Sequence, residues 1–102
     1  MNTRAPLSLI DFCTRYPDES VGEAMERSVA FAQHAESLGY SRIWYSEHHN
    51  MSSIVSSTPA VLIAHIGAKT ERIRLGSGGV MLPNHSPYVI ACLLYTSDAA
   101  DD

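Results

Sequence analysis

"SRIWYSEHHN", residues 41–50, joins an apolar run to a cluster of ionisable side chains. The first six residues, 41–46, contain aromatic and β-branched side chains, which favour a β-strand. Glu47, His48 and His49 follow directly, where that strand should end. Three interpretations are open at this point: a polar loop, a metal site, or a catalytic histidine at the mouth of a barrel. The elements on either side decide among them.

A strand and a helix are predicted on the N-terminal side of this stretch. Residues 6–12, PLSLIDF, form a short apolar run that predicts a mostly buried strand. Ser20 and Glu23 fit the S-x-x-E capping box, which marks a helix start. Apolar and small side chains then recur three or four residues apart, at Val21, Ala24, Met25, Ser28, Val29, Ala32, Ala35 and Leu38. This spacing predicts one buried helix face, and Gly39 is well placed to end the helix.

The same alternation continues on the C-terminal side. Thr58–Pro59 is a helix start signal, with Thr as the cap and Pro at the first helical position, and 60–70 continues as an apolar helix. Residues 72–82 predict a third strand that runs into a glycine-rich turn, and Ser86–Pro87 repeats the start signal. Strands that alternate with helices predict an α/β fold with a parallel sheet of right-handed βαβ units. Three strands and two helices cover such a sheet poorly, so we expect residues 1–91 to be the opening of a larger domain.

Composition excludes several functional classes. The chain has 102 residues, is 45% hydrophobic and carries a formal net charge of −4. Without Asp98, Asp101 and Asp102 it has 8 acidic and 7 basic residues, a net charge of −1. It has neither a basic stripe for nucleic acid nor a cationic helix or long apolar run for a membrane. Two cysteines and no secretory signal predict a reducing, cytoplasmic setting.

The last eleven residues, 92–102, do not continue the pattern of the helix that starts near Ser86. The ordinary interpretation of CLLYTSDAADD is a frayed helix end with an acidic terminus. Back-translated, however, the segment resembles a sequencing adapter of the transposase type. We therefore predict that 1–91 is the native part of the chain and that 92–102 is a non-native tail.

Candidate functional residues follow two of the predicted strands. His48 and His49 come after strand 41–46, and the GSGG segment, 76–79, lies where the third strand ends. Loops at the carboxyl ends of parallel strands carry the active sites of α/β folds, so these two segments are expected to bracket one pocket. Glycine allows the backbone to approach a flat or anionic ligand closely. GSGG lacks the spacing of a dinucleotide fingerprint or a P-loop.

The paired histidines favour acid–base chemistry over metal binding. Adjacent residues in an extended chain point in roughly opposite directions, so His48 and His49 are not expected to face one site. The sequence also lacks the H-x-H and H-x-x-x-H spacings of metal sites. His65 lies in the predicted helix 60–70 and is expected to be half-buried. A single imidazole suits a catalytic acid, base or donor because it titrates near neutral pH.

Two segments of the chain resemble a known enzyme family. "GYSRIWYSEHHN", 39–50, followed by "RLGSGGVMLPNHSP", 74–87, resembles the bacterial-luciferase-like flavin-dependent monooxygenases. That family folds as a (β/α)₈ TIM barrel of about three hundred residues or more. The resemblance implies that this chain holds the first three βα units of the barrel, which is incomplete in this chain.

The resemblance also implies roles for individual residues. His48 matches the catalytic histidine, which acts in proton transfer, and Glu47 matches a position next to the flavin. Gly78 and Gly79 match the cofactor-binding place where luciferase-type members have a non-prolyl cis peptide. The implied cofactor is reduced FMN supplied by a partner flavin reductase, or a deazaflavin. The implied chemistry is oxidation of an unknown small organic substrate with O₂, and a dimeric full-length protein is compatible with it.

Three alternatives stay open. One is a non-catalytic flavin-binding subunit with the same barrel. Another is a metal-dependent barrel hydrolase that uses His48, His49 and His85. The last is that the 102-residue product has no function of its own, because an open three-stranded sheet leaves an edge unpaired and a face uncovered, which predicts aggregation.

Overall fold

The structure is a computed structural model that describes residues 5–98. Its elements, in chain order, are β1 (Ser8–Asp11), α1 (Val21–Ser37), β2 (Arg42–Tyr45), α2 (Pro59–Gly67), β3 (Arg74–Ser77), the 3₁₀ turn η1 (Leu82–Asn84) and α3 (Pro87–Asp98). The predicted alternation of strands and helices is confirmed. Each strand is shorter than the sequence pattern predicted, at four residues.

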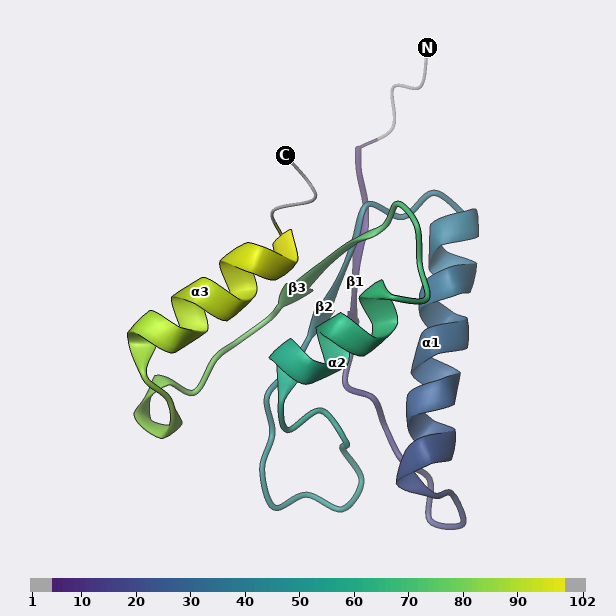
Figure 1. Ribbon diagram of the computed structural model, residues 1–102. Helices are drawn as coiled ribbons and strands as arrows, with labels where there is room; N and C mark the ends of the chain where they lie inside the picture. The colour runs from purple at the N-terminus through teal and green to yellow at the C-terminus, as the bar shows by residue number, and fades with distance from the viewer. Residues whose placement is uncertain (1–4, 99–102) are drawn as a thin grey trace.

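The three strands form one parallel sheet in the order β1-β2-β3. Ile10 pairs with Trp44, and Trp44 pairs with Gly76, so these three residues share one face of the sheet. Their neighbours Leu9, Ile43 and Leu75 share the opposite face. In Figure 1, α1 runs along one side of the sheet, α2 crosses in front of it, and α3 lies beside β3. The sheet therefore has one face covered by helices and one that is bare.

The core lies between the covered sheet face and the small residues of α1. Ala24, Ser28, Ala32 and Ala35 form the buried stripe of that helix. They are small enough to let α1 approach the buried side chains of β2, Ile43 and Tyr45, which are 0% exposed. Leu62, Ile63 and Ile66 of α2 complete this core, together with Leu75 of β3. Burial of these apolar side chains is the main force that holds the helices on the sheet.

The ends of α1 and α2 can be compared with the caps predicted from the sequence. At α1 both hydrogen bonds of the capping box between Ser20 and Glu23 are present, and Gly39 ends the helix with φ 87°. Such a φ is readily adopted by glycine and costs other residues energy. Thr58 is the N-cap of α2, but its side chain makes no capping hydrogen bond. The predicted position of Thr58 as the cap, with Pro59 first in the helix, is therefore confirmed. The Thr58 backbone carbonyl instead accepts from the N–H groups of Val61 and Leu62.

Glu36 ties the end of α1 to the start of β3. Its Oε2 accepts the backbone N–H groups of Glu71 at 2.9 Å, of Arg72, and of Ile73 at 2.8 Å. The hydrogen bonds from Arg72 and Ile73 lower the pKa of Glu36 below its ordinary value. One carboxylate thus fixes the turn that delivers the chain into β3, because an ionised acceptor holds backbone donors strongly.

The described part of α3 continues past the predicted boundary at residue 91. The helix begins at Pro87, as the Ser86–Pro87 signal predicted, and runs to Asp98. Residues 99–102 of the predicted tail lie outside the described residues. The division into 1–91 and 92–102 stays a prediction.

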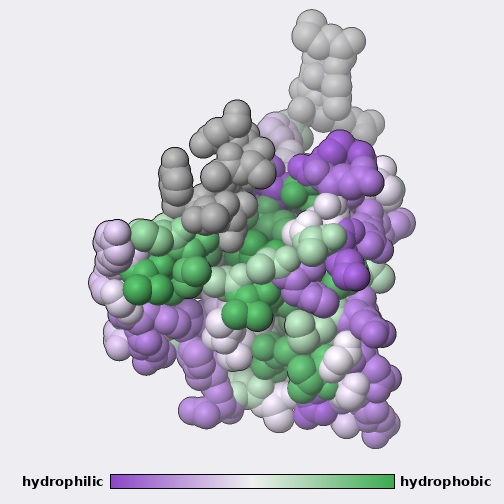
Figure 2. All heavy atoms as spheres, viewed as in Figure 1, coloured by the Kyte–Doolittle hydropathy of each residue, from purple (hydrophilic) through white to green (hydrophobic). Residues whose placement is uncertain are grey.

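Apolar side chains remain exposed on both sides of the molecule. On the bare sheet face Ile10 is 53% exposed and Trp44 38%. Figure 2 shows hydrophobic residues gathered over α2 and α3, where Val61, Val89 and Leu93 are exposed. Within residues 5–98, β1 and β3 each pair on one side only. This is the pattern of a partial sheet that requires further elements to cover it.

This exposure generates a first prediction. Expressed alone, the 102-residue chain should self-associate through its bare face, because exposed apolar faces and open strand edges drive association. Sedimentation velocity should show oligomers that the double variant Ile10→Lys, Trp44→Lys reduces. Leu38→Lys, at the exposed end of α1, is the matched control and should leave the oligomers in place. A monomeric wild-type chain would contradict this prediction.

Candidate active site

The candidate site begins with a buried carboxylate at the carboxyl end of β2. The Glu47 side chain is 1% exposed. Its Oε2 lies 2.7 Å from His49 Nε2 and 3.0 Å from His85 Nε2, and its Oε1 lies 3.1 Å from the same His85 nitrogen. Oε1 also accepts the backbone N–H of Met81 at 3.2 Å. Glu47 thus joins the loop after β2 to the loop after β3.

The electrostatics of Glu47 follow from these contacts. Burial raises the pKa of the carboxyl, because it penalises the charged form. Hydrogen bonds from His49, His85 and the Met81 N–H stabilise the charged form, and together they hold the pKa of Glu47 below its ordinary value. The buried group is therefore a carboxylate acceptor near neutral pH.

His48 points away from this cluster. Its backbone N–H donates to the Ser56 carbonyl at 2.9 Å, which fixes the loop. Its ring meets Phe12 edge-on, with centroids 5.6 Å apart, and its Nδ1 is buried with no hydrogen-bond partner in the described part of the chain. Because His49 turns toward Glu47 while His48 turns toward Phe12, the predicted divergence of the two histidines is confirmed.

The glycine segment 76–79 spans the end of β3, and a Cβ would meet different surroundings at each of its glycines. The Gly78 N–H donates to the Tyr45 carbonyl at 2.7 Å. A Cβ at Gly76 would lie 2.8 Å from the Trp44 ring, so a larger residue there would displace that ring. At Gly78 a Cβ would lie 3.4 Å from the Tyr45 oxygen and 3.5 Å from Trp44 Cβ, whereas at Gly79 it would meet nothing within 4 Å. Gly79 therefore presents open backbone.

The peptide bonds of the described residues are all trans. The cis peptide that the family resemblance implies between Gly78 and Gly79 is therefore not found here. The Ser77 hydroxyl donates to the Gly79 carbonyl at 2.7 Å across this turn.

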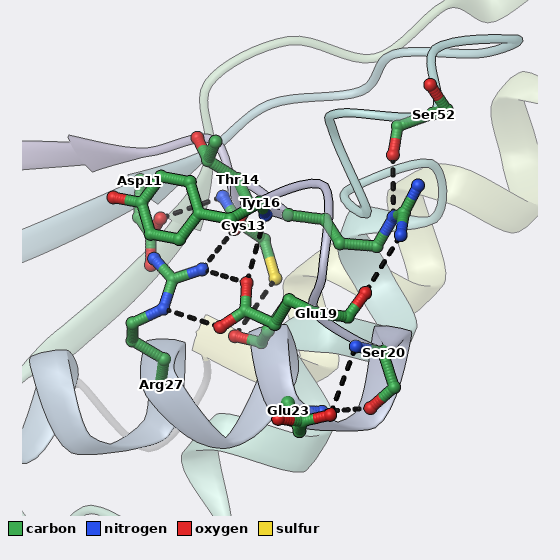
Figure 3. Close-up of polar contacts among 11 residues, drawn as sticks. Asp11, Cys13, Thr14, Tyr16, Glu19, Ser20, Glu23, Arg27 and Ser52 are labelled. Carbon is green, nitrogen blue, oxygen red and sulfur yellow. Dashed lines mark hydrogen bonds and ion pairs between the residues drawn. The ribbon is translucent and has the colours of Figure 1, made fainter.

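The loop after β1 supports the loop that carries His48 (Figure 3). Arg15 Nε donates to the Ser52 carbonyl at 2.8 Å, and Arg15 Nη1 donates to the Glu19 carbonyl at the same distance. The Cys13 carbonyl accepts the Val55 N–H at 3.0 Å. No short motif in the sequence marks these contacts, since Arg15 and Ser52 are 37 residues apart. The β1 loop is thus a support that sequence reasoning missed.

A second cluster stiffens the same loop at the start of α1. Arg27 forms an ion pair with Glu19 and stacks on Tyr16, with its guanidinium carbon 4.4 Å from the ring centroid. The hydrogen bond from Arg27 lowers the pKa of Glu19. Figure 3 shows these side chains around the turn from β1 into α1. The arrangement fixes the loop from which Arg15 reaches Ser52.

The geometry does not support the metal-dependent hydrolase. His49 and His85 meet at Glu47, but His48 lies on the other side of the loop. In residues 5–98 no group of three or more His, Cys, Asp or Glu side chains is arranged to hold a metal ion.

His65, which was expected to be half-buried, is exposed on α2, because the buried side of that helix is formed by Pro59, Leu62, Ile63 and Ile66. In the same described range, no helix is both long and apolar enough to cross a membrane.

The sequence profile of the luciferase-like monooxygenases matches residues 8–99. The chain belongs to this family. A luciferase-like monooxygenase of Escherichia coli (strain K12) is 50% identical over 84 residues, which are 82% of this chain and 25% of that protein. The chain therefore spans about a quarter of the length of the curated relatives it matches.

Two solved structures place the fold within that family. The crystal structure of apo-MsnO8 superposes with a TM-score of 0.86 at 34% identity, covering 95% of this chain and 30% of that one. The oxygenating constituent of 3,6-diketocamphane monooxygenase from Pseudomonas putida, solved in complex with FMN, gives a TM-score of 0.73 at 26% identity and covers 86% and 24%. The predicted family and its N-terminal barrel units are confirmed. The site residues stay predictions.

The Glu47 cluster generates a second prediction, for the full-length protein. Glu47→Gln keeps an acceptor oxygen but removes the charge, so the free energy of unfolding near neutral pH should fall by about 1–3 kcal/mol. Because folding lowers the pKa of Glu47, its stabilisation is present above the unfolded value of 4.5 and disappears as the pH falls through the folded pKa. Urea unfolding at several pH values should therefore show the wild type and the variant converging in acid.

The control for this prediction is Glu26→Gln, a change at an exposed position of α1. It should move the unfolding curve little at any pH. A stability difference for Glu47→Gln that stays constant from neutral to acid pH would contradict the role assigned to its charge.

Proposed function

We propose that the full-length protein is a flavin-dependent monooxygenase that uses reduced FMN and O₂ to oxidise a small organic substrate. In this proposal the described chain supplies one part of the pocket rim. The observation that carries it is the meeting of two loops at the carboxyl ends of neighbouring parallel strands, joined through Glu47. Family membership and the FMN complex of a relative support the same assignment.

The bare sheet face suits a flat cofactor. Ile10 and Trp44 give it an apolar surface, and Gly78 lies beside both, with a Cβ there 3.5 Å from Trp44 Cβ and 3.9 Å from Ile10 Cδ1. Gly79 leaves its backbone open to a neighbouring ring, since a Cβ there would meet no atom within 4 Å. His48 adds a buried Nδ1 whose hydrogen-bonding capacity no described residue uses. Apolar walls with a few polar groups are the usual lining of a cofactor pocket.

Each residue then has a role in the proposal. His48 is the catalytic residue, whose imidazole holds or moves a proton at Nδ1. Gly78 and Gly79 are cofactor-binding residues that admit the ring, and Glu47 belongs to the same rim through its hold on the β3 loop. When bound in its reduced state, the flavin supplies the electrons that activate O₂. We propose that a partner reductase delivers FMNH₂, with a deazaflavin as the second candidate cofactor.

The proposal predicts that His48→Ala separates binding from chemistry. In the full-length protein this variant should bind FMN within about three-fold of the wild type, because the rim glycines are unchanged. Oxygenation should fall by about 10²-fold or more, since a positioned acid–base group contributes that much. Fluorescence titration gives the affinity for FMN. O₂ consumption with reduced FMN and a substrate turned over by the wild type gives the rate.

His65→Ala, on the exposed side of α2, is the matched control and should resemble the wild type. Unchanged turnover in His48→Ala would overturn the role of His48. A wild type that binds FMN but oxidises no member of a broad panel of small organic compounds would favour a non-catalytic flavin-binding subunit instead.

A further inference from the structure

We propose that His85 is a positioning residue that shapes the flavin-binding loop through the Glu47 carboxylate. This inference rests on the proposed function, because it assigns a task to a residue next to the rim. It comes from the way in which a single buried carboxylate meets both ends of one short segment.

That segment is the turn after the glycines. Met81 donates its N–H to Glu47 Oε1 at 3.2 Å where the turn begins, and His85 places Nε2 3.0 and 3.1 Å from the two carboxylate oxygens where it ends. Between them lies η1, with the His85 N–H donating to the Leu82 carbonyl at 3.0 Å. The Glu47 carboxylate therefore connects the first and last residues of the turn, Met81 and His85, and holds the turn in one shape.

The rim glycines lie immediately before this turn. Gly78 is held at its N–H by the Tyr45 carbonyl, and Gly79 at its carbonyl by the Ser77 hydroxyl. The chain from Gly79 to Met81 is thus fixed on one side by the end of β3 and on the other by Glu47. Without His85, the far side of this stretch would depend on the single Met81 contact, and the open backbone at Gly79 would lose its fixed position.

His49 offers a built-in comparison. It contacts the same carboxylate at 2.7 Å, a shorter distance than His85 has, but it lies only two residues from Glu47 in the same loop. Its side chain is 35% exposed, against 25% for His85. Loss of His49 therefore removes a local hydrogen bond, whereas loss of His85 disconnects two loops. Both histidines hydrogen-bond to Glu47, but only His85 does so from the other loop. A comparison of the two therefore distinguishes positioning of the β3 loop from support of the Glu47 charge alone.

The surroundings of His85 offer it little else to bind. A cavity of about 300 Å³ lies beside it, walled by apolar side chains of α2 and α3, such as Pro59, Val61 and Ile90. Thr58, Asn84 and Ser86 are its neutral polar members. Among the described groups that contact Glu47, His49 and His85 are the titratable ones. Glu47 is consequently the anion that holds the His85 ring in place.

The test uses the full-length protein with three variants. His85→Leu removes the donor, His85→Gln keeps an N–H at a similar reach, and His49→Leu is the comparator. Amide hydrogen exchange of residues 78–85 without cofactor reports the loop directly. FMN affinity from fluorescence titration reports the consequence for binding, and a denaturant midpoint for each variant separates loop effects from global unfolding.

We expect His85→Leu to speed exchange across 78–85 and to weaken FMN about ten-fold, the scale of one lost charge-assisted hydrogen bond. His85→Gln should restore both within about three-fold, and His49→Leu should affect both less than His85→Leu does. Exchange and FMN affinity that are unchanged in His85→Leu, or an equal effect of His49→Leu, would overturn the proposal.

Failure of the proposed function gives a different result. If the wild type binds no FMN, the FMN assignment fails, and with it the FMN-binding part of this inference. Exchange across 78–85 would still show whether His85 shapes the loop, because that readout needs no cofactor. Slow exchange in His85→Leu would reject the positioning role whatever the affinity for FMN.

Discussion

A buried carboxylate that receives donors from two loops is the constraint on which the candidate site depends. Removing an ionised group from water is costly unless hydrogen bonds replace its hydration. Glu47 obtains those bonds from His49 in its own loop, and from Met81 and His85 in the next. Because the donors come from both loops, neither loop can move without leaving a charge or a donor unpaired. Two strand ends that are neighbours in the sheet are thereby held in one conformation.

The rest of the fold brings these two loops close enough to share the Glu47 carboxylate. Parallel pairing in the order β1-β2-β3 brings the carboxyl ends of β2 and β3 together, and Glu36 fixes the turn that starts β3. Trp44 lies across Gly76 on the bare face, where a Cβ would come within 2.8 Å of its ring. The helices pack on the opposite face, so within the described residues the bare face is open to further elements of the barrel and to the proposed cofactor.

Local patterns predicted much of this arrangement. The capping box at Ser20, the α1 stripe and the alternation of elements depend on residues close in the chain, and periodicity reports such contacts well. The divergence of His48 and His49 followed from the geometry of an extended chain. Pairing between Glu47 and His85, 38 residues apart, leaves no local pattern, because it depends on how the loops meet in space. Thr58 caps α2 at the predicted position but makes no side-chain hydrogen bond there, since a residue type permits such a bond without enforcing its geometry.

The central claim is that the bare face beside Gly79 and His48 forms part of a flavin pocket. The most direct test is a crystal structure of the full-length protein soaked with FMN. We expect a flavin ring that lies on the side of the sheet that carries Ile10 and Trp44, next to the open backbone of Gly79, with the His48 imidazole facing it. A flavin bound on the helix side of the sheet, or a His48 ring turned toward Glu47, would contradict this claim.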